Sequence, residues 1–170
     1  MPDAAGSGPV PTFLTLAQAI GDTRTVDEIY AIALDALAGA IGVQRSSILL
    51  FDQDGVMRFK ASRGLSDAYR AAVEGHSPWT PGTTHATPIV SPDVEADEGL
   101  QPYLAIIRAE GIRGMAFIPL LGSGRVIGKF MLYFAEPREL SSHELQFVAA
   151  IAAQVAFAVE RTRAEAHARR

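Results

Sequence analysis

The sequence predicts an α+β domain built on an antiparallel sheet. Strand-like runs occur in two adjacent pairs, and helical or irregular segments lie before, between and after these pairs. Adjacent strand pairs favour antiparallel hairpins, whereas a parallel sheet needs a helix between its strands. The 170 residues, 48% of them hydrophobic, are enough for one such domain with its own core.

The first predicted helix lies between Thr25 and Gly42. Apolar residues recur at helical spacing in TVDEIYAIALDALAGAIG. Thr25 and Glu28 match a capping box at its start, and Gly42 is suited to end it. Residues 1–11 are mainly Pro, Gly, Ala and Ser, so we expect a disordered tail there and an ordered domain from residue 12.

Two hairpins are predicted. The first joins RSSILLF to VMRFKAS through a turn that ends in Asp54 and Gly55, and the second joins IRGMAFIPLL to RVIGKFMLYFAE through a turn at 122–124. The runs AFIPLL and VIGKFMLYF are almost continuously apolar, which is typical of strands covered on both faces. We therefore expect the second hairpin to supply the central strands of the sheet.

The segment between the hairpins is predicted to be largely irregular. Ser66 can cap two helical turns in SDAYRAAVEG, and a further helix is expected from Gln101 to Glu110, ended by Gly111. The four prolines between these two helices exclude a long regular element.

The last helix is predicted to begin at a capping box of Ser141 and Glu144 and to run to about Ala168. Its apolar stripe has the spacing of a coiled-coil seam. The stripe predicts either packing on the sheet or a homodimer seam, and it consists of Val148, Ala152, Val155 and Val159. Residues 164–170 are interpreted as a polar helical extension or linker.

Composition and charge exclude several classes of function. With 15 Lys and Arg against 19 Asp and Glu, the formal charge of −4 lacks the cationic field of a nucleic-acid binder. The absence of cysteine excludes disulfides, thiolate metal sites and thioether-linked chromophores. The start has no export-signal pattern and no run of ~18 apolar residues occurs, so a cytoplasmic location without membrane contact is expected.

Four segments together resemble the GAF domain family of sensory modules in signalling proteins. They are SSILLFDQDG, TPIVSPDVEAD, GIRGMAFIPLLGSGRVIGKFMLYF and SSHELQFVAAIAAQVAFAVERTR, and the resemblance covers about 12–163. It implies a central six-stranded antiparallel sheet with the terminal helices packed on one face. A ligand pocket is implied on the other face, roofed by the irregular middle segment.

The resemblance also implies a function. Such a domain is a non-catalytic sensory and regulatory module of a signal-transduction protein, for example the sensor histidine kinase of a two-component system. It binds a small molecule and relays its state through the terminal helices of a homodimer to an effector domain, of kinase or cyclase type, outside this chain. The alternative is a ligand-free module for dimerisation or interdomain contact, whose pocket is filled by its own Phe59, Trp79, Phe117 and Phe130.

The resemblance places a set of candidate ligand-binding residues on or near the pocket face. They are Phe59, Trp79, His85, Ile89, Asp93, Ile112, Phe117, Phe130 and Leu132. The Asn-Lys-Phe-Asp…Glu signature of cyclic-nucleotide-binding members has no counterpart here, and both bilin attachment and methionine sulfoxide reduction need a cysteine. The identity of the ligand and of any cofactor therefore stays open.

Neither catalysis nor a metal site is expected. No nucleophile elbow of the Gly-x-Ser-x-Gly kind occurs. Of the histidines, only His76 and His85 fall in the predicted roof, and no carboxylate pattern typical of a metal site accompanies them.

Overall fold

The computed structural model describes residues 13–22 and 25–169, so the predicted tail at 1–11 lies outside the described residues. The elements in chain order, with η marking 3-10 helices, are α1 (Phe13–Asp22), α2 (Val26–Ile41), β1 (Arg45–Phe51), β2 (Met57–Arg63), α3 (Asp67–Val73), β3 (Ile89–Ser91), η1 (Val94–Ala96), η2 (Glu98–Tyr103), α4 (Leu104–Ala109), β4 (Gly114–Gly122), β5 (Arg125–Phe134) and α5 (Ser142–Ala168).

The strands form one antiparallel sheet in the order β2-β1-β5-β4-β3. β5 is the central strand, with β1 on one side and β4 on the other. The predicted α+β arrangement is confirmed, and so is the prediction that the second hairpin supplies central strands.

The sheet has five strands in the described part of the chain, so the expected number of six is wrong. Between α3 and β3, where a further strand would have to come from, the chain makes only an isolated bridge from Thr84 to Arg125. Pro78, Pro81 and Pro88 in this stretch have no N–H to donate to a strand ladder. The stretch is therefore a loop and not a sixth strand.

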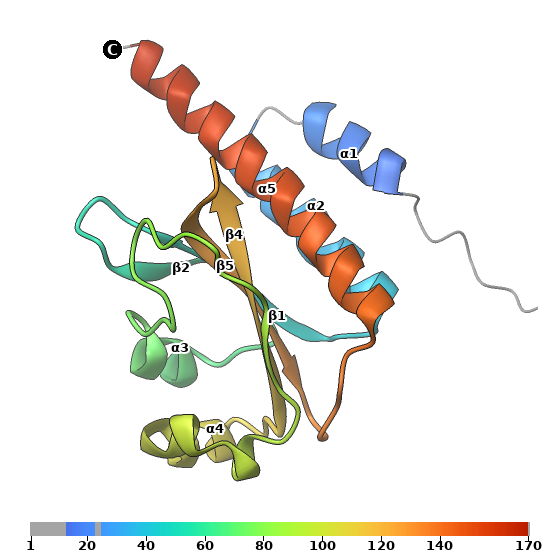
Figure 1. Ribbon diagram of the computed structural model, residues 1–170, viewed down its shortest axis with the longest axis vertical. Coiled ribbons are helices and arrows are strands. Elements are labelled where there is room, and N and C mark those ends of the chain that lie inside the picture. Colours follow the sequence, from blue (N-terminus) through green and yellow to red (C-terminus); the bar gives the residue numbers. More distant parts are fainter. Residues whose placement is uncertain (1–12, 23–24, 170) are drawn as a thin grey trace, which may run out of the picture.

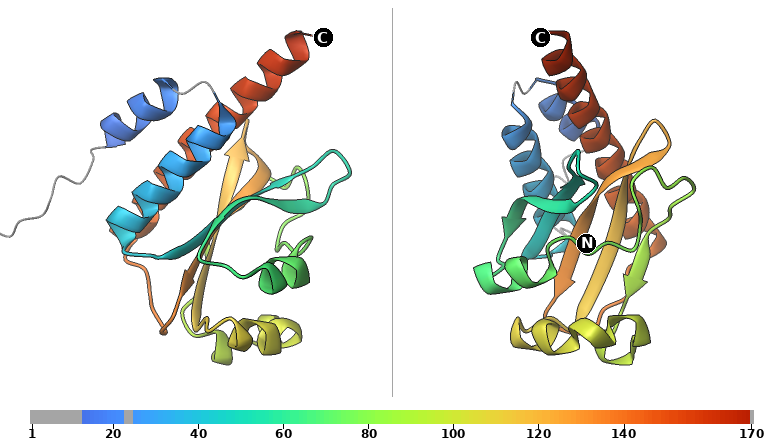
Figure 2. Two further views of the ribbon diagram at one scale, coloured as in Figure 1. Left: turned by 180° about the vertical axis from the view of Figure 1, so that it is seen from behind. Right: turned by 90° about the vertical axis from the view of Figure 1, so that its left-hand side faces the viewer.

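Three helices cover one face of the sheet (Figure 1, Figure 2). α5 and α2 contact the strands, and α1 packs on α5 and α2. Side chains that alternate toward these helices, such as Ile48, Ile118 and Phe130, are 0% exposed and form a single core with them. The terminal helices thus lie on one face, as predicted.

The opposite face of the sheet carries the smaller elements α3, η1, η2 and α4 (Figure 1). A second core lies between them and the strands, and it includes Leu49, Met115 and Met131. Because successive side chains of a strand point to opposite faces, β5 contributes to both cores.

The predicted helix ends are formed by the expected residues. The Thr25 hydroxyl accepts a hydrogen bond from the Glu28 N–H at 3.3 Å, and Gly42 ends α2 with φ of 73°. At α5 the Ser141 hydroxyl accepts from the Glu144 N–H, and the Glu144 carboxylate accepts from the Ser141 N–H, both at 3.0 Å. These bonds satisfy N–H groups that a helix start leaves free.

α1 is a helix that the sequence did not predict. It spans only 10 residues, so its local signal is weak. Its stability comes from packing on α5 and α2, with Ile20 only 3% exposed.

α5 is long and apolar enough, by length and composition, to cross a membrane. Its apolar stripe is nevertheless buried in the core that covers the sheet. Its last turns extend beyond the sheet (Figure 1), where residues 163–169 are exposed.

Two phenylalanines provide a test of the helix-side core. Phe130 is 0% exposed and Phe157 on α5 is 65% exposed. We expect Phe130→Ala to lower the free energy of unfolding by about 3–5 kcal/mol, because it removes a buried ring and leaves a cavity. The matched Phe157→Ala should change it by no more than about 0.5 kcal/mol. Urea denaturation followed by circular dichroism measures both, and similar losses would contradict the assigned core.

Candidate functional site

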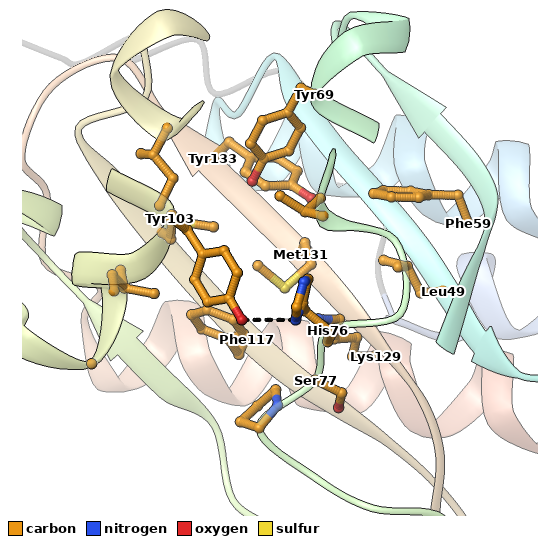
Figure 3. Close-up of a pocket in the computed structure, with 16 residues that line it drawn as sticks. Leu49, Phe59, Tyr69, His76, Ser77, Tyr103, Phe117, Lys129, Met131 and Tyr133 are labelled. Atoms are coloured by element: carbon orange, nitrogen blue, oxygen red, sulfur yellow. Dashed lines mark hydrogen bonds between the residues drawn. The ribbon is translucent and has the colours of Figure 1, made fainter. Parts of the chain in front are cut away.

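A cavity of about 240 Å³ lies on the sheet face opposite the terminal helices (Figure 3). Its lining residues come from the strands below and from α3, the following loop, η2 and α4 above. They are Leu49, Phe59, Tyr69, Val73, His76, Ser77, Pro78, Gly99, Leu100, Tyr103, Ile107, Met115, Phe117, Lys129, Met131 and Tyr133.

The floor of the cavity follows from the strand register. Lys129, Met131 and Tyr133 alternate on β5, so all three point to this face. Across the ladders, Lys129 pairs with Leu49 of β1 and Met131 pairs with Phe117 of β4. Neighbouring strands therefore fill the gaps between the three β5 side chains with apolar groups.

The roof consists of residues 69–78 and 99–107. A contact between His76 and Tyr103 joins its two parts: the tyrosine hydroxyl lies 2.8 Å from His76 Nδ1, and the two rings are 4.5 Å apart between centroids. In Figure 3 the side chains of Tyr103 and His76 point toward each other, and the hydrogen bond joins them. We call the His76–Tyr103 contact the latch, because it ties the loop after α3 to η2.

Lys129 is a buried cation in this cavity. Lys129 is 5% exposed, and its Nζ donates a hydrogen bond to the His76 carbonyl oxygen at 3.0 Å. Nζ also lies 5.4 Å from the centre of the Phe117 ring, an arrangement favourable to a cation. Burial lowers its pKa from the ordinary 10.5 to about 8. No carboxylate lines the cavity, and no ion pair to Lys129 exists within the described residues.

Two tyrosines form the other end of the cavity. The rings of Tyr69 and Tyr133 meet edge to face with centroids 5.8 Å apart. The Tyr133 hydroxyl lies 2.9 Å from the buried Ser47 hydroxyl. Burial raises the pKa of both tyrosines, so both hydroxyls stay neutral at physiological pH.

Two of the predicted ligand-binding residues line the cavity, and one lies behind it. Phe59 and Phe117 are in the lining. Ile112 is 0% exposed and belongs to the core beside the cavity, but it does not reach the cavity surface.

Phe130 and Leu132 lie on the opposite face of the sheet, so the predicted position of both is corrected. Both are 0% exposed in the core that faces the helices. β5 is apolar at almost every position, so its sequence has no polar–apolar alternation that would show which side chains point toward the cavity. The neighbours Lys129, Met131 and Tyr133 occupy the predicted place.

The remaining four predicted residues lie outside the cavity. Trp79 is half-buried in the loop just after the lining residues Ser77 and Pro78, His85 is exposed, and Ile89 is 41% exposed. Asp93 caps η1 through the Glu95 N–H at 3.0 Å and lies 3.7 Å from Arg113. Its role in the structure is thus that of a helix cap.

Among the polar residues of the site, His76 was expected in the roof but not as a ligand-binding residue, and four others were missed: Lys129, Tyr69, Tyr103 and Tyr133. A usable signal existed only for Lys129, which interrupts the apolar run VIGKFMLYF. A lysine within a strand that is covered on both faces must be buried, and buried lysines are rare.

The predicted homodimer seam is part of the monomer core. Val148, Ala152, Val155 and Val159 are at most 1% exposed and pack in the helix-side core. These four residues are therefore already buried within the monomer. The exposed face of α5 instead carries Gln146, Ala149, Ala153 and Phe157.

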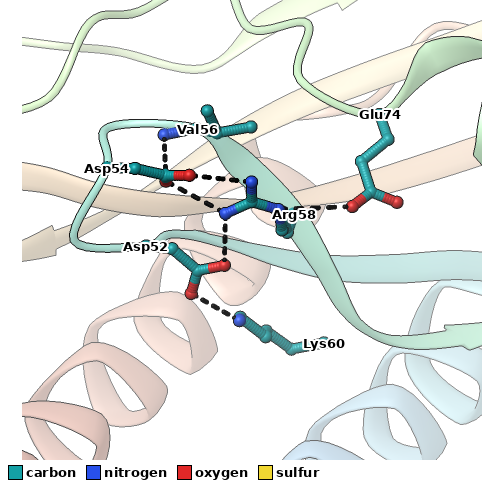
Figure 4. Close-up of polar contacts among 6 residues, drawn as sticks. All are labelled: Asp52, Asp54, Val56, Arg58, Lys60 and Glu74. Atoms are coloured by element: carbon teal, nitrogen blue, oxygen red, sulfur yellow. Dashed lines mark hydrogen bonds and ion pairs between the residues drawn. The ribbon is translucent and has the colours of Figure 1, made fainter.

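A cluster of charged residues lies at the turn of the β1–β2 hairpin (Figure 4). Arg58 bonds Asp52 at 2.9 Å and Asp54 at 2.8 Å, and Lys60 bonds Asp52 at 2.6 Å. The Lys60 and Arg58 hydrogen bonds lower the pKa of the Asp52 carboxyl. Asp52 and Asp54 also line a groove together with Arg163, Ala166 and His167 of α5. The hairpin whose strands contribute Leu49 and Phe59 to the cavity therefore ends beside the last turns of α5.

No group of three or more His, Asp or Glu side chains that could hold a metal ion occurs in the described part of the chain.

Comparison with known proteins identifies similar domains. The family model described as GAF domain matches residues 23–160. A domain of a proposed two-component sensor histidine kinase protein from Sinorhizobium meliloti 1021 is 41% identical, with a TM-score of 0.81, over 87% of this chain and all of that one (100%). No match is found among the curated proteins.

More distant solved structures share the fold. The GAF domain of an Acinetobacter phosphoenolpyruvate-protein phosphotransferase is 16% identical with a TM-score of 0.69, covering 93% of this chain and 96% of that one. The GAF3 photoproduct-state structure from Slr1393 of Synechocystis sp. PCC6803 is 16% identical with a TM-score of 0.67, covering 86% and 100%.

The buried charge of Lys129 makes stability depend on pH. Below about pH 8 the lysine is protonated in the folded and unfolded chains, and the full cost of burying the charge is present. Between pH 8 and 10.5 the folded protein gives up this proton before the unfolded chain does, so stability rises with pH. We expect a rise of about 2 kcal/mol between pH 7 and pH 9.5, measured by urea denaturation.

Lys129→Met is the matched control for this rise. The variant should be more stable than the wild type at pH 7 and should lack the wild-type increase. The raised pKa values of Tyr69 and Tyr133 oppose the trend only above about pH 10, where unfolded tyrosines ionise. An identical pH dependence in both proteins would show that Lys129 is not a buried charge.

The latch can be tested without disturbing the cavity wall. Tyr103→Phe keeps the ring and removes the hydroxyl that bonds His76. Loss of one such hydrogen bond should speed amide hydrogen exchange in residues 74–88 roughly two- to tenfold. The amides of α2 serve as an internal control and should be unchanged. Unchanged exchange in 74–88 would mean that the latch does not hold the roof.

Proposed function

The chain belongs to the GAF domain family, and we propose that it is a non-catalytic sensory domain that binds a small molecule in the cavity above β5. In this proposal it works in the cytoplasm as part of a signal-transduction protein. The observation that carries the proposal is the roofed cavity with the unpaired, buried Lys129 in its lining. The sensor-kinase domain from Sinorhizobium meliloti, 41% identical to this chain, supports the signalling role.

A buried ammonium group supports a ligand over an empty structural void. Burying a charge is costly unless the charge is paired, and Lys129 has only a neutral carbonyl and an aromatic ring as partners. Proteins place unfavourable groups of this kind mainly at functional sites. A purely structural pocket would be filled by apolar side chains, as in the alternative with Phe59 and Phe117 as plugs, yet a volume of about 240 Å³ stays open between them.

The size of the cavity limits the ligand. Sites for drug-sized molecules have volumes of roughly 300–1,000 Å³, so this cavity suits a smaller compound. A large chromophore or nucleotide would require the roof to move away from the sheet.

The β1–β2 hairpin is the proposed route from the cavity to the effector. Leu49 and Phe59 of this hairpin line the cavity, and Asp52 and Asp54 at its turn share a groove with Arg163 and His167 of α5. A shift of the strands on ligand binding would change this groove at the end of the helix. In the proposal α5 continues this signal toward a kinase- or cyclase-type effector domain outside this chain.

A ligand-free module for dimerisation is the second candidate. It is favoured by Phe157, a large apolar side chain that is 65% exposed on α5. Exposed aromatic residues are enriched at protein interfaces. A homodimer through this face of α5 is compatible with both candidates, because the cavity lies on the other side of the sheet.

Filling the cavity distinguishes the two candidates. Native mass spectrometry of the domain purified from cells should show a co-purified small-molecule mass on the wild type. Leu100→Trp enlarges a half-buried lining residue and should abolish this mass. Leu121→Trp, at a position 37% exposed and outside the cavity, should retain it.

The same spectra give the number of subunits. A dimer without any bound mass, unchanged by Leu100→Trp, would favour the interaction module over the sensor.

A further inference from the structure

The cavity has two chemically different ends along β5. Lys129 and the adjacent roof residues His76 and Ser77 form a polar end, whereas Tyr69 and Tyr133 form an aromatic end (Figure 3). The Cα atoms of Lys129 and Tyr133 are four residues apart on one strand, which corresponds to roughly 13 Å. An occupant that satisfies both ends must therefore be elongated, with one polar and one apolar end.

The polar end requires a negative charge. An ammonium group has three donors, and the structure supplies one acceptor to Lys129, the His76 carbonyl at 3.0 Å. No Asp or Glu lines the cavity, so the positive charge is not neutralised there. The lowered pKa of Lys129 reports the same deficit, since a neighbouring anion would raise it.

The number of cationic groups limits the charge of the ligand. Among the described residues, Lys129 is the one Lys or Arg in the lining, and most of the other lining residues are apolar. Phosphate groups are usually held by several donors or by the guanidinium fork of an arginine. A single lysine with apolar walls suits a monoanion such as a carboxylate.

The other end favours a flat ring. Tyr69 and Tyr133 already meet edge to face, and Met131 lies next to Tyr133 on the same face of β5. Aromatic rings and a methionine sulfur pack well against the face or edge of another ring. The volume of about 240 Å³ allows one ring or a small fused pair.

We propose that the ligand is a small aromatic carboxylate, whose carboxylate pairs with Lys129 while its ring lies between Met131 and the tyrosine pair Tyr69 and Tyr133. This proposal rests on the proposed function, because it names the class of molecule that occupies the same cavity. The carboxylate takes donors of Lys129 that now lack an acceptor, and the ring replaces empty space.

A set of matched compounds tests the proposal by isothermal titration calorimetry at pH 7. Benzoate and phenylacetate carry the ring and the anion, benzamide and 2-phenylacetamide are their neutral counterparts, benzylamine is a cation, and acetate lacks the ring. We expect each acid to bind at least about tenfold more tightly than its amide, because a charged partner strengthens the bond to lysine. Benzylamine and acetate should bind more weakly than either acid.

Variants locate the effect. Lys129→Met should bring the affinities of acid and amide within about threefold of each other. Lys129→Gln provides a second test, because it replaces the charged side chain with a neutral polar one. Leu100→Trp should abolish binding of every ring compound, and Leu121→Trp should leave all affinities unchanged. Unfolding curves of each variant show that it is folded before titration.

Two results would overturn the proposal, and they have different meanings. Amides or benzylamine that bind as well as the acids would reject the anionic class, yet the cavity would still be a ligand site. Absence of binding by all ring compounds would reject the aromatic class. In that case the co-purified mass in native spectra decides separately whether the proposed sensory function survives.

Discussion

Strand β5 must be covered on both of its faces, and the rest of the domain follows from that requirement. Phe130 and Leu132 point toward the helices, whereas Lys129, Met131 and Tyr133 point the other way. A strand that is apolar on both sides needs two covering layers. The terminal helices supply the first layer, and the segment from α3 to α4 supplies the second. The second layer is made of short elements and loops, and the cavity of about 240 Å³ lies beneath it.

Most elements could be predicted from the sequence because their signals are local. The capping pairs Thr25 with Glu28 and Ser141 with Glu144 mark helix starts, and the turns near Gly55 and 122–124 mark hairpins. α1 is short and depends on packing against α5 and α2. The sixth strand was expected from the family resemblance. It does not form in the described part of this chain, where Pro78, Pro81 and Pro88 have no N–H to donate to a strand ladder.

The candidate site was predictable only in part, for a different reason. Phe59 and Phe117 were placed at the cavity, but Phe130 and Leu132 were assigned to the wrong face of the sheet. An unbroken apolar strand does not reveal which of its side chains point to which face. His76 and Tyr103 are brought together by a hydrogen bond between a loop and a 3-10 helix that lie 27 residues apart in sequence. Such contacts depend on loop conformation, which has no periodicity to read.

The bond between Lys129 and the His76 carbonyl joins the floor of the cavity to its roof. This carbonyl accepts from one donor of the lysine, and the ring of the same residue contacts Tyr103. An ammonium group has three donors, so Lys129 can keep this bond while two donors stay available to an anion. In the proposed complex a bound carboxylate and the roof would therefore share one lysine, which links occupancy of the cavity to the position of the loop after α3.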